Sequence, residues 1–105
     1  MISRIWHGYT RPGEADAYEA LLRDEIFTSI EDRSIDGFQE IQLFRRDLTD
    51  EVEFITVMWF DSWDAVRSFA GEDFEASVVP PAARELLARF DERSQHYEVR
   101  ERRTS

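Results

Sequence analysis

The sequence predicts one α+β domain with the element order β-α-β-β-α-β, in which two helices cover one face of an antiparallel sheet. Three observations lead to this prediction. Four segments have the composition or periodicity of strands, two main segments and one shorter segment between them have helical spacing, and a chain of 105 residues suits a single domain. We expect residues 1–100 to form this domain and residues 101–105 to be a polar C-terminal tail that frays.

The first predicted strand, Ile2–Thr10, alternates its side chains between two faces. One face carries Ile5, His7 and Tyr9, and the other carries Ile2, Arg4, Trp6 and Gly8. Pro12 then suits the first turn of a helix, where its missing N–H costs little. We expect this helix to run from Glu14 to about Asp32, with an apolar stripe made of Tyr18, Leu21, Leu22, Ile26 and Ile30.

A turn at Asp36-Gly37 leads into a predicted hairpin of two strands joined at Thr49-Asp50. In the first of them, Phe38–Leu48, one face carries Ile41 and Leu43, and the other carries Phe38, Glu40, Gln42 and Phe44. The second, Glu51–Phe60, is apolar on both faces. Val52, Phe54, Met58 and Phe60 point one way, and Ile55, Val57 and Trp59 point the other. A strand of this kind needs cover on both sides.

The second half of the chain begins with a predicted helix over Asp61–Gly71, capped by Asp61 or Ser62, with Trp63, Val66 and Phe69 facing inward. Glu72–Val79 is expected to form a loop or a short helical turn. Pro80-Pro81 then opens a last helix, whose apolar face is Leu86, Leu87 and Phe90. Ser94–Val99 is the fourth predicted strand.

This order of elements is the split βαβ, ferredoxin-like arrangement with a four-stranded antiparallel sheet. Its two main helices lie on one face of the sheet, so the other face holds Ile, Val, Phe and Trp side chains with no cover from the same chain. An exposed apolar patch of that size is an aggregation hazard or an interface. We therefore expect a homodimer in which two sheets pack face to face.

Composition excludes several classes of function. The net charge of −10 disfavours nucleic acid and anionic membrane surfaces as partners. All thirteen basic residues are Arg, so lysine Schiff-base chemistry is excluded, and without Cys there are no disulfides or thiolate sites. No apolar run approaches the roughly 20 residues of a membrane span, and the N-terminal segment lacks the pattern of a signal peptide. We expect a cytoplasmic protein.

Four segments of the chain carry a resemblance to a known family: RIWHGYT, RPGEADAYEALL, FDSWDAVRSFAGEDFEASVVPP and FDERSQHYEV. They resemble the dimeric α/β-barrel superfamily and, within it, the antibiotic-biosynthesis monooxygenase-like group. The resemblance implies a homodimer whose two sheets close into a barrel, with a pocket in each subunit between sheet and helices. Family members of known activity oxygenate phenolic or quinol-type compounds without a bound metal or flavin, and relatives degrade haem, isomerise sugars or cyclise polyketides.

The sequence departs from two patterns of that superfamily. Haem-degrading members resemble one another in an iron-ligating helix His and an Asn near the first strand. Here the matching helix carries Phe69 and Phe74, and the chain has no Asn, so haem degradation is not expected. The Asn that some cofactor-free oxygenases use together with Trp is missing as well.

Four polar residues are candidates for catalysis. His96 and, second to it, His7 could act as a base toward a phenol or enol, with Glu98 orienting His96; the alternative is that each His is a hydrogen-bonded core or interface residue. Arg4 or Tyr97 could stabilise oxyanion charge. Alternatively, an inward-facing Arg4 pairs with Glu53 or Glu98, and Tyr97 packs with Val99.

Aromatic residues supply the candidate substrate-binding set, a stacking pocket for a flat ligand made of Trp6, Trp59, Trp63, Phe69 and Phe74. The alternative is that they form the core and the dimer interface. No HxH, HxxxH or ExxH spacing and no nucleotide-binding motif is present, so we expect neither a metal site nor a cofactor.

The family resemblance, taken with the aromatic, His and Arg content, implies a cofactor-independent monooxygenase-like enzyme that acts on a small phenol, quinol or polyketide-type aromatic. Two alternatives use the same pocket: a non-catalytic dimeric protein that binds a small molecule, and a cyclase or isomerase that does not consume oxygen.

Overall fold

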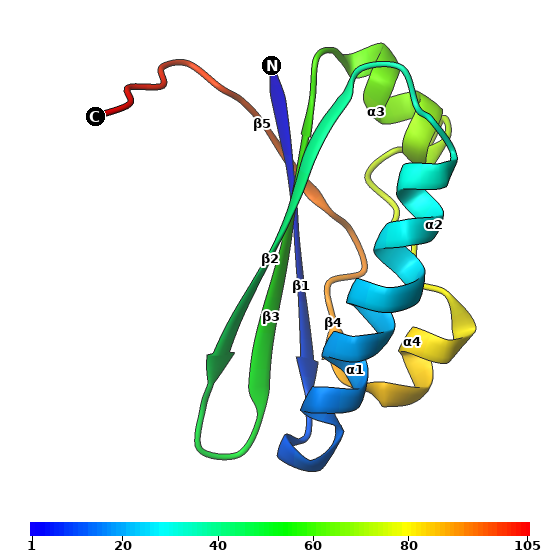
Figure 1. The fold of residues 1–105 in the computed structure, drawn as a ribbon, viewed down its shortest axis with the longest axis vertical. Coiled ribbons are helices and arrows are strands. Elements are labelled where there is room, and N and C mark those ends of the chain that lie inside the picture. Colours follow the sequence, from blue (N-terminus) through cyan, green and yellow to red (C-terminus); the bar gives the residue numbers. More distant parts are fainter.

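A twisted antiparallel sheet carries all the helices of the protein on one face (Figure 1). In the computed structural model, which describes residues 1–105, the strands are β1 (Ile2–Thr10), β2 (Phe38–Asp47), β3 (Val52–Phe60), β4 (Leu87–Phe90) and β5 (Gln95–Glu98). The helices are α1 (Ala15–Leu21), α2 (Phe27–Asp32), α3 (Trp63–Ala70) and α4 (Pro81–Leu86). This arrangement confirms the predicted α+β, ferredoxin-like fold.

The first two helices are parts of one continuous helix. A π-helical turn at Leu22–Ile26 joins α1 to α2, and the backbone stays helical through both junctions. The predicted helix from Glu14 to about Asp32 is thus confirmed. Tyr18 and Leu22 are its most buried large residues. π-Helical turns of this kind often occur at functional sites, and this one forms part of the cavity described below.

The sheet has the strand order β2-β3-β1, and the free edge of β1 pairs with two short strands. β5 covers the first half of β1, and β4 covers its end. The two long central strands pair throughout their length, with Arg4 opposite Met58 and Ile5 opposite Val57. Arg4 and Met58 face the helices. Ile5 and Val57 point to the face without helices, which we call the outer face.

Two details differ from the sequence-based expectation. Phe38 packs on the helical side, 5.8 Å from the ring of Phe60, because a bulge between Phe38 and Glu40 reverses its direction. The last helix ends at Leu86, and the residues that follow it, Leu87–Phe90, form β4 instead of another helical turn. Pairing with the open end of the β1 edge favours the extended conformation here.

The core consists of two separate buried clusters between helices and sheet. One contains Ile2, Met58, Phe60, Ala65, Val66 and Phe69. The other contains Ala15, Tyr18, Leu22, Val52, Phe54 and Ala83. The two clusters do not merge, and the space between them, over the sheet, contains a cavity. No helix in the protein is both long enough and apolar enough to span a lipid bilayer.

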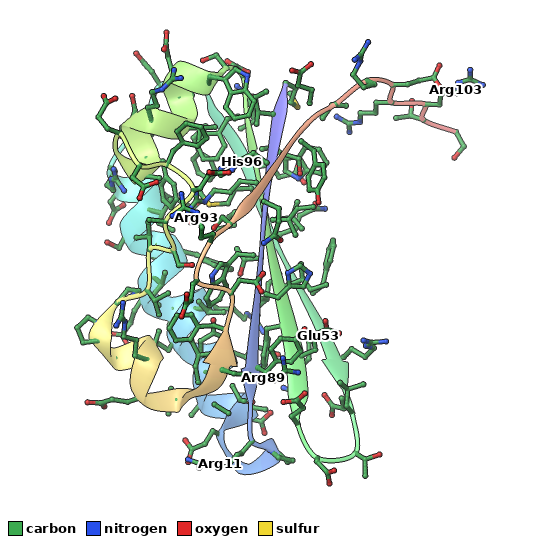
Figure 2. The ribbon with its side chains drawn as sticks, turned by 180° about the vertical axis from the view of Figure 1, so that it is seen from behind. Arg11, Glu53, Arg89, Arg93, His96 and Arg103 are labelled. Atoms are coloured by element: carbon green, nitrogen blue, oxygen red, sulfur yellow. The ribbon has the colours of Figure 1, made fainter.

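Beyond β5 the chain leaves the body of the protein. Residues 100–105 are exposed and lack regular structure, and Figure 2 shows Arg103 far from the sheet. The predicted polar tail at 101–105 therefore lies in this projecting segment.

Candidate functional site

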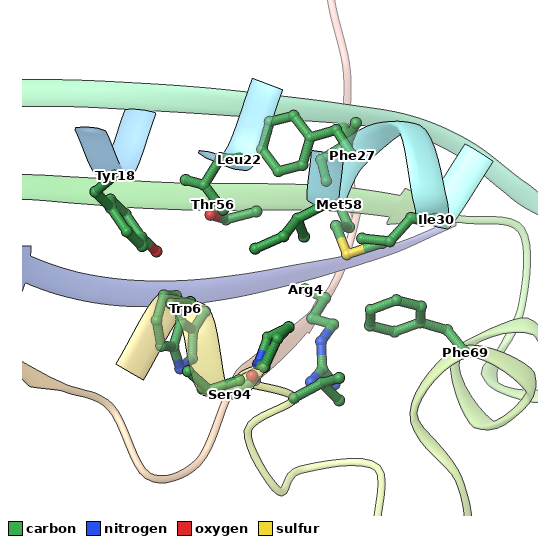
Figure 3. A pocket seen from close by; sticks show the side chains of 16 residues that line it. Arg4, Trp6, Tyr18, Leu22, Phe27, Ile30, Thr56, Met58, Phe69 and Ser94 are labelled. Atoms are coloured by element: carbon green, nitrogen blue, oxygen red, sulfur yellow. The ribbon is translucent and has the colours of Figure 1, made fainter. Parts of the chain in front are cut away.

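A cavity of about 70 Å³ lies between the two core clusters, under the middle of β1 and β3. Its walls are mostly apolar, and the polar side chains that reach it are Arg4, Trp6, Tyr18, Thr56 and Ser94 (Figure 3). The cavity alone is smaller than the roughly 300 Å³ of ordinary small-molecule sites. It therefore accommodates only one end of a ligand.

The cavity continues into a more open groove of about 490 Å³ between α2 and the segment that precedes α4. Five residues line both spaces and form the neck between them: Ile26, Ile30, Phe69, Val78 and Pro80. Cavity and groove together offer the volume and the apolar walls that a flat aromatic molecule requires. Such a molecule would place its buried end beside Arg4.

Arg4 is the only charged residue that lines the cavity, and it is 4% exposed. Its guanidinium donates to the carbonyl oxygens of Phe74 and Ala76, the latter at 3.3 Å, and contacts His96. No carboxylate pairs with it, so the predicted pairing with Glu53 or Glu98 is wrong. Glu53 instead accepts hydrogen bonds from Arg46 and Tyr9. Burial lowers the pKa of Arg4 to about 10, which leaves it cationic at pH 7.

His96 lies directly opposite Arg4 on the paired strand β5. Its Nε2 is 3.0 Å from Nη1 of Arg4, and its ring packs between Phe74 and Trp63, with centroids 5.2 Å and 5.9 Å away. Burial, and after it the charge of Arg4, lowers the pKa of His96 to about 4. His96, Trp63 and Phe74 thus form a layer behind Arg4 and do not line the cavity.

Trp6 forms a fixed wall of the cavity. Its indole N–H donates to the backbone carbonyl of Asp91 at 2.8 Å and to the hydroxyl of Ser77 at 3.0 Å. Gly8 makes room for the ring, because a Cβ at that position would come within 2.9 Å of the indole. Two hydrogen bonds and close packing against Gly8 thus hold the indole ring at this position.

Phe69, one of the five residues of the neck, lies between two arginines. Its ring centroid is 5.3 Å from Cζ of Arg4 on the inside and 5.4 Å from Cζ of Arg33 on the groove side. Arg33 also donates to the carbonyl oxygens of Ser68 and Phe69 near the end of α3. The segment after α3 is held by Arg4 through Phe74 and Ala76, so the predicted loop at Glu72–Val79 has a defined path over the cavity.

Three of the candidate residues lie on the outer face, away from this cavity. Nδ1 of His7 is 2.7 Å from Oδ2 of Asp91, which also accepts the backbone N–H of His7 at 3.0 Å. Trp59 donates to Gln42 at 3.0 Å, and Tyr97 is 55% exposed. The structure therefore brings Arg4, Trp6 and Phe69 together at the cavity, places the His96 layer behind them, and separates His7, Trp59 and Tyr97 from both.

Three polar residues of the cavity were not expected from the sequence. Thr56 interrupts the apolar helical side of β3 between Phe54 and Met58, and this break in the pattern was the available signal. Tyr18 reads as an ordinary member of an apolar helical stripe, although burial raises the pKa of its hydroxyl above the usual value. Ser94 lies just before β5, where a serine gives no signal of its own. No group of three or more His, Asp or Glu side chains is placed to hold a metal ion.

Comparison with known proteins supports the fold. No family profile and no curated protein matches the sequence. A crystal structure from Bacillus cereus, described as that of a candidate antibiotic biosynthesis monooxygenase, superposes with a TM-score of 0.71 at 14% identity, covering 100% of this chain and 96% of that one. Rv0793 from Mycobacterium tuberculosis superposes with a TM-score of 0.61 at 20% identity, covering 98% of both chains. The chain thus has the same overall fold as these two solved structures.

Proposed function

We propose that this protein is a monooxygenase-like enzyme that binds a small phenol or quinol as its anion, with the ionised oxygen on Arg4. The observation that carries the proposal is a buried guanidinium without a carboxylate partner at the end of an apolar cavity. A buried charge without a counter-ion is costly, and an anionic ligand oxygen would relieve that cost. The flat wall of Trp6 and the apolar neck suit the ring that carries this oxygen.

The reaction needs no electrons beyond those of the substrate. An ionised phenol is electron-rich at the carbons ortho to its oxygen, and one of these carbons would attack O₂ to form a C–O bond. Cleavage of the O–O bond with loss of the hydrogen on that carbon then gives an ortho-quinone and one water molecule. The phenol is oxidised, O₂ is reduced, and both oxygen atoms are accounted for. Arg4 would hold the phenolate in a dry site, where its charge acts strongly.

His96 is proposed to position Arg4 and not to act as the base. At a pKa of about 4, its imidazole is neutral and only weakly basic at pH 7. Its Nε2 is moreover occupied by Arg4 at 3.0 Å. In this scheme the phenol loses its proton to solvent on entry, because the nearby guanidinium makes the phenol more acidic. This role replaces the one expected from the sequence.

Oxygen consumption in the presence of naphthols and hydroquinones tests the proposal. With ¹⁸O₂, mass spectrometry should find one labelled atom in the quinone and the other in water. Arg4→Met should abolish oxygen uptake. It should also abolish the ionisation of the bound phenol, which is monitored by the absorbance of the naphtholate. Turnover that persists in this variant would show that the proposed role of Arg4 is wrong.

A non-catalytic binding protein is the second candidate, and the engagement of His96 by Arg4 favours it, because no free base faces the cavity. Tight binding of phenols without any conversion would support this alternative. Conversion without oxygen consumption would instead indicate a cyclase or isomerase.

We also propose that the protein forms a homodimer through the outer face. The centre of this face carries Ile5, Phe44, Ile55, Val57 and Trp59, and no helix covers it (Figure 1). Phe44 is 48% exposed in the single chain. Polar pairs, such as His7 with Asp91 and Tyr9 with Glu53, lie toward one end of this face. An apolar centre with a polar border is the usual composition of a protein interface.

A further inference from the structure

We infer that Ser94 is a second recognition point of the cavity, which donates a hydrogen bond to a neutral oxygen of the substrate across the ring from the oxygen on Arg4. The inference rests on the proposed function and narrows its substrate class to phenols with a second oxygen, an ether or hydroxyl, at the para position. It assigns a specificity role to a residue that has no other visible function.

The hydroxyl of Ser94 is buried and has no partner in the protein. Ser94 is 3% exposed, and its Oγ is one of three buried side-chain polar atoms without a hydrogen bond. Buried hydroxyls are nearly always hydrogen-bonded, so an unpaired one beside a cavity indicates that something else binds there. The other two atoms belong to Thr10 and His96, and neither residue lines the cavity.

The main chain of Ser94 is fixed although its side chain is free. Its N–H donates to the carbonyl of Glu75 at 2.6 Å. Ser77 offers a contrast nearby, because its hydroxyl accepts from Trp6 and donates to the carbonyl of Asp91. The same stretch of the fold thus satisfies one serine hydroxyl internally and leaves the other unpaired in the wall of the cavity.

The position of Ser94 relative to Arg4 suggests the para geometry. Arg4 is paired with His96, and Ser94 precedes His96 by two residues, immediately before β5 begins. That offset corresponds to about 7 Å along a strand. Arg4, Trp6 and Ser94 lie on the same side of the cavity in Figure 3. A ring lying against Trp6 would present one oxygen to each of the other two residues.

Two probes of nearly equal shape separate the contribution of the second oxygen. 4-Methoxy-1-naphthol carries an ether oxygen where 4-ethyl-1-naphthol carries a CH₂ group, and both keep the hydroxyl for Arg4. Their affinities would be measured calorimetrically without oxygen, so that neither probe is converted. One neutral hydrogen bond predicts that the wild-type protein prefers the methoxy compound by about five- to tenfold. Ser94→Ala should remove this preference while leaving the affinity for the ethyl compound unchanged.

Thr10→Val is the matched control, because it removes another unpaired buried hydroxyl that lies outside the cavity. This variant should keep the preference. Equal affinities of the wild-type protein for the two probes, or a preference that survives in Ser94→Ala, would overturn the role of Ser94 but leave the proposed function standing. If neither probe binds to the wild-type protein, both the inference and the proposed phenol site are wrong.

Discussion

Nη1 of Arg4 lies 3.0 Å from Nε2 of His96, and this contact determines the protonation of the imidazole. Because a guanidinium can only donate hydrogen bonds, Nε2 must be the acceptor, and the ring proton resides on Nδ1. That Nδ1 is buried without a partner. His96 is therefore a neutral support for a buried cation, and this relationship leads to two measurable consequences.

The first is a loss of stability at acidic pH. The pKa of His96 is about 4 in the folded chain, whereas an imidazole in the unfolded chain has the ordinary value of 6.5. The unfolded chain therefore binds the proton more tightly. The contribution of neutral His96 to the free energy of unfolding is present in full above pH 6.5 and is lost as the pH falls toward 4. After allowance for solvent screening, we expect a loss of about 1–2 kcal/mol.

Urea denaturation of the wild-type protein and of His96→Gln across this pH range measures the effect. Glutamine keeps an acceptor for Arg4 but does not titrate. The difference in unfolding free energy between the two proteins therefore reports the titration of the imidazole, because the effects of the many carboxylates cancel. A difference in unfolding free energy that stays constant between pH 4 and 6.5 would contradict the lowered pKa.

The second consequence concerns Arg4→Met. Removing the buried charge relieves its desolvation but leaves two carbonyl acceptors unpaired, so we expect the unfolding free energy to fall by less than about 2 kcal/mol. The pKa of His96 should rise, because the repulsion by Arg4 is gone, yet stay below 6.5, since burial is its larger cause. NMR titration of the imidazole gives this value directly.

Ligand affinity should also fall in Arg4→Met. A hydrogen bond to a charged group is worth about 1.5–3 kcal/mol, so binding of 4-methoxy-1-naphthol should weaken by at least about tenfold. Arg33→Met is the control, because Arg33 contacts the same Phe69 ring but lines the outer groove instead of the cavity that would hold the phenolate oxygen. Equal losses in both variants would indicate general electrostatic attraction instead of a specific phenolate contact.

Much of the fold could be predicted because alternation and helical spacing reflect burial directly. The two faces of β1 and β3 follow from the sequence, as the register of Arg4 with Met58 confirms. β4 could not be predicted, because the spacing of Leu86, Leu87 and Phe90 fits a helical face as well as a strand. The unpaired edge of β1 decides between them, and that edge exists only in three dimensions.

The site was predictable only in part for a related reason. Alternation places Arg4 and Trp6 on the same face of β1, but it does not reveal that this face is the one covered by the helices. The partners of Arg4 are backbone carbonyls of an irregular segment, and carbonyls leave no trace in a sequence. The unpaired hydroxyl of Ser94 is likewise a property of its surroundings, so a lone serine could not reveal it.

Gly8→Ala tests whether Trp6 must be held in place. The added Cβ would lie 2.9 Å from the indole, and only movement of the ring or of Leu87 relieves this overlap. Overpacking of this kind costs about 1–3 kcal/mol, which thermal or urea unfolding would detect together with a change in Trp fluorescence. Gly13→Ala is the control, because nothing lies within 4 Å of its added Cβ. If Gly8→Ala proves as stable as Gly13→Ala, the wall formed by Trp6 is not rigid.

Phe44→Asp tests the proposed dimer. Phe44 lies on the outer face opposite Ile55 and is 48% exposed in the single chain, so the substitution should change the unfolding free energy of a monomer by no more than about 0.5 kcal/mol. Val57 is unsuitable for this test, because it is only 5% exposed and an Asp there would damage the fold itself.

In a sheet-to-sheet dimer the same Asp buries an unpaired charge at the interface, which is strongly unfavourable. Light scattering during gel filtration should therefore show a wild-type dimer and a Phe44→Asp monomer with unchanged circular dichroism. Val78→Asp provides the control, since Val78 is 53% exposed but lines the groove on the helical side, and this variant should remain dimeric. A wild-type monomer, or a Phe44→Asp variant that stays dimeric, would show that the outer face is not the interface.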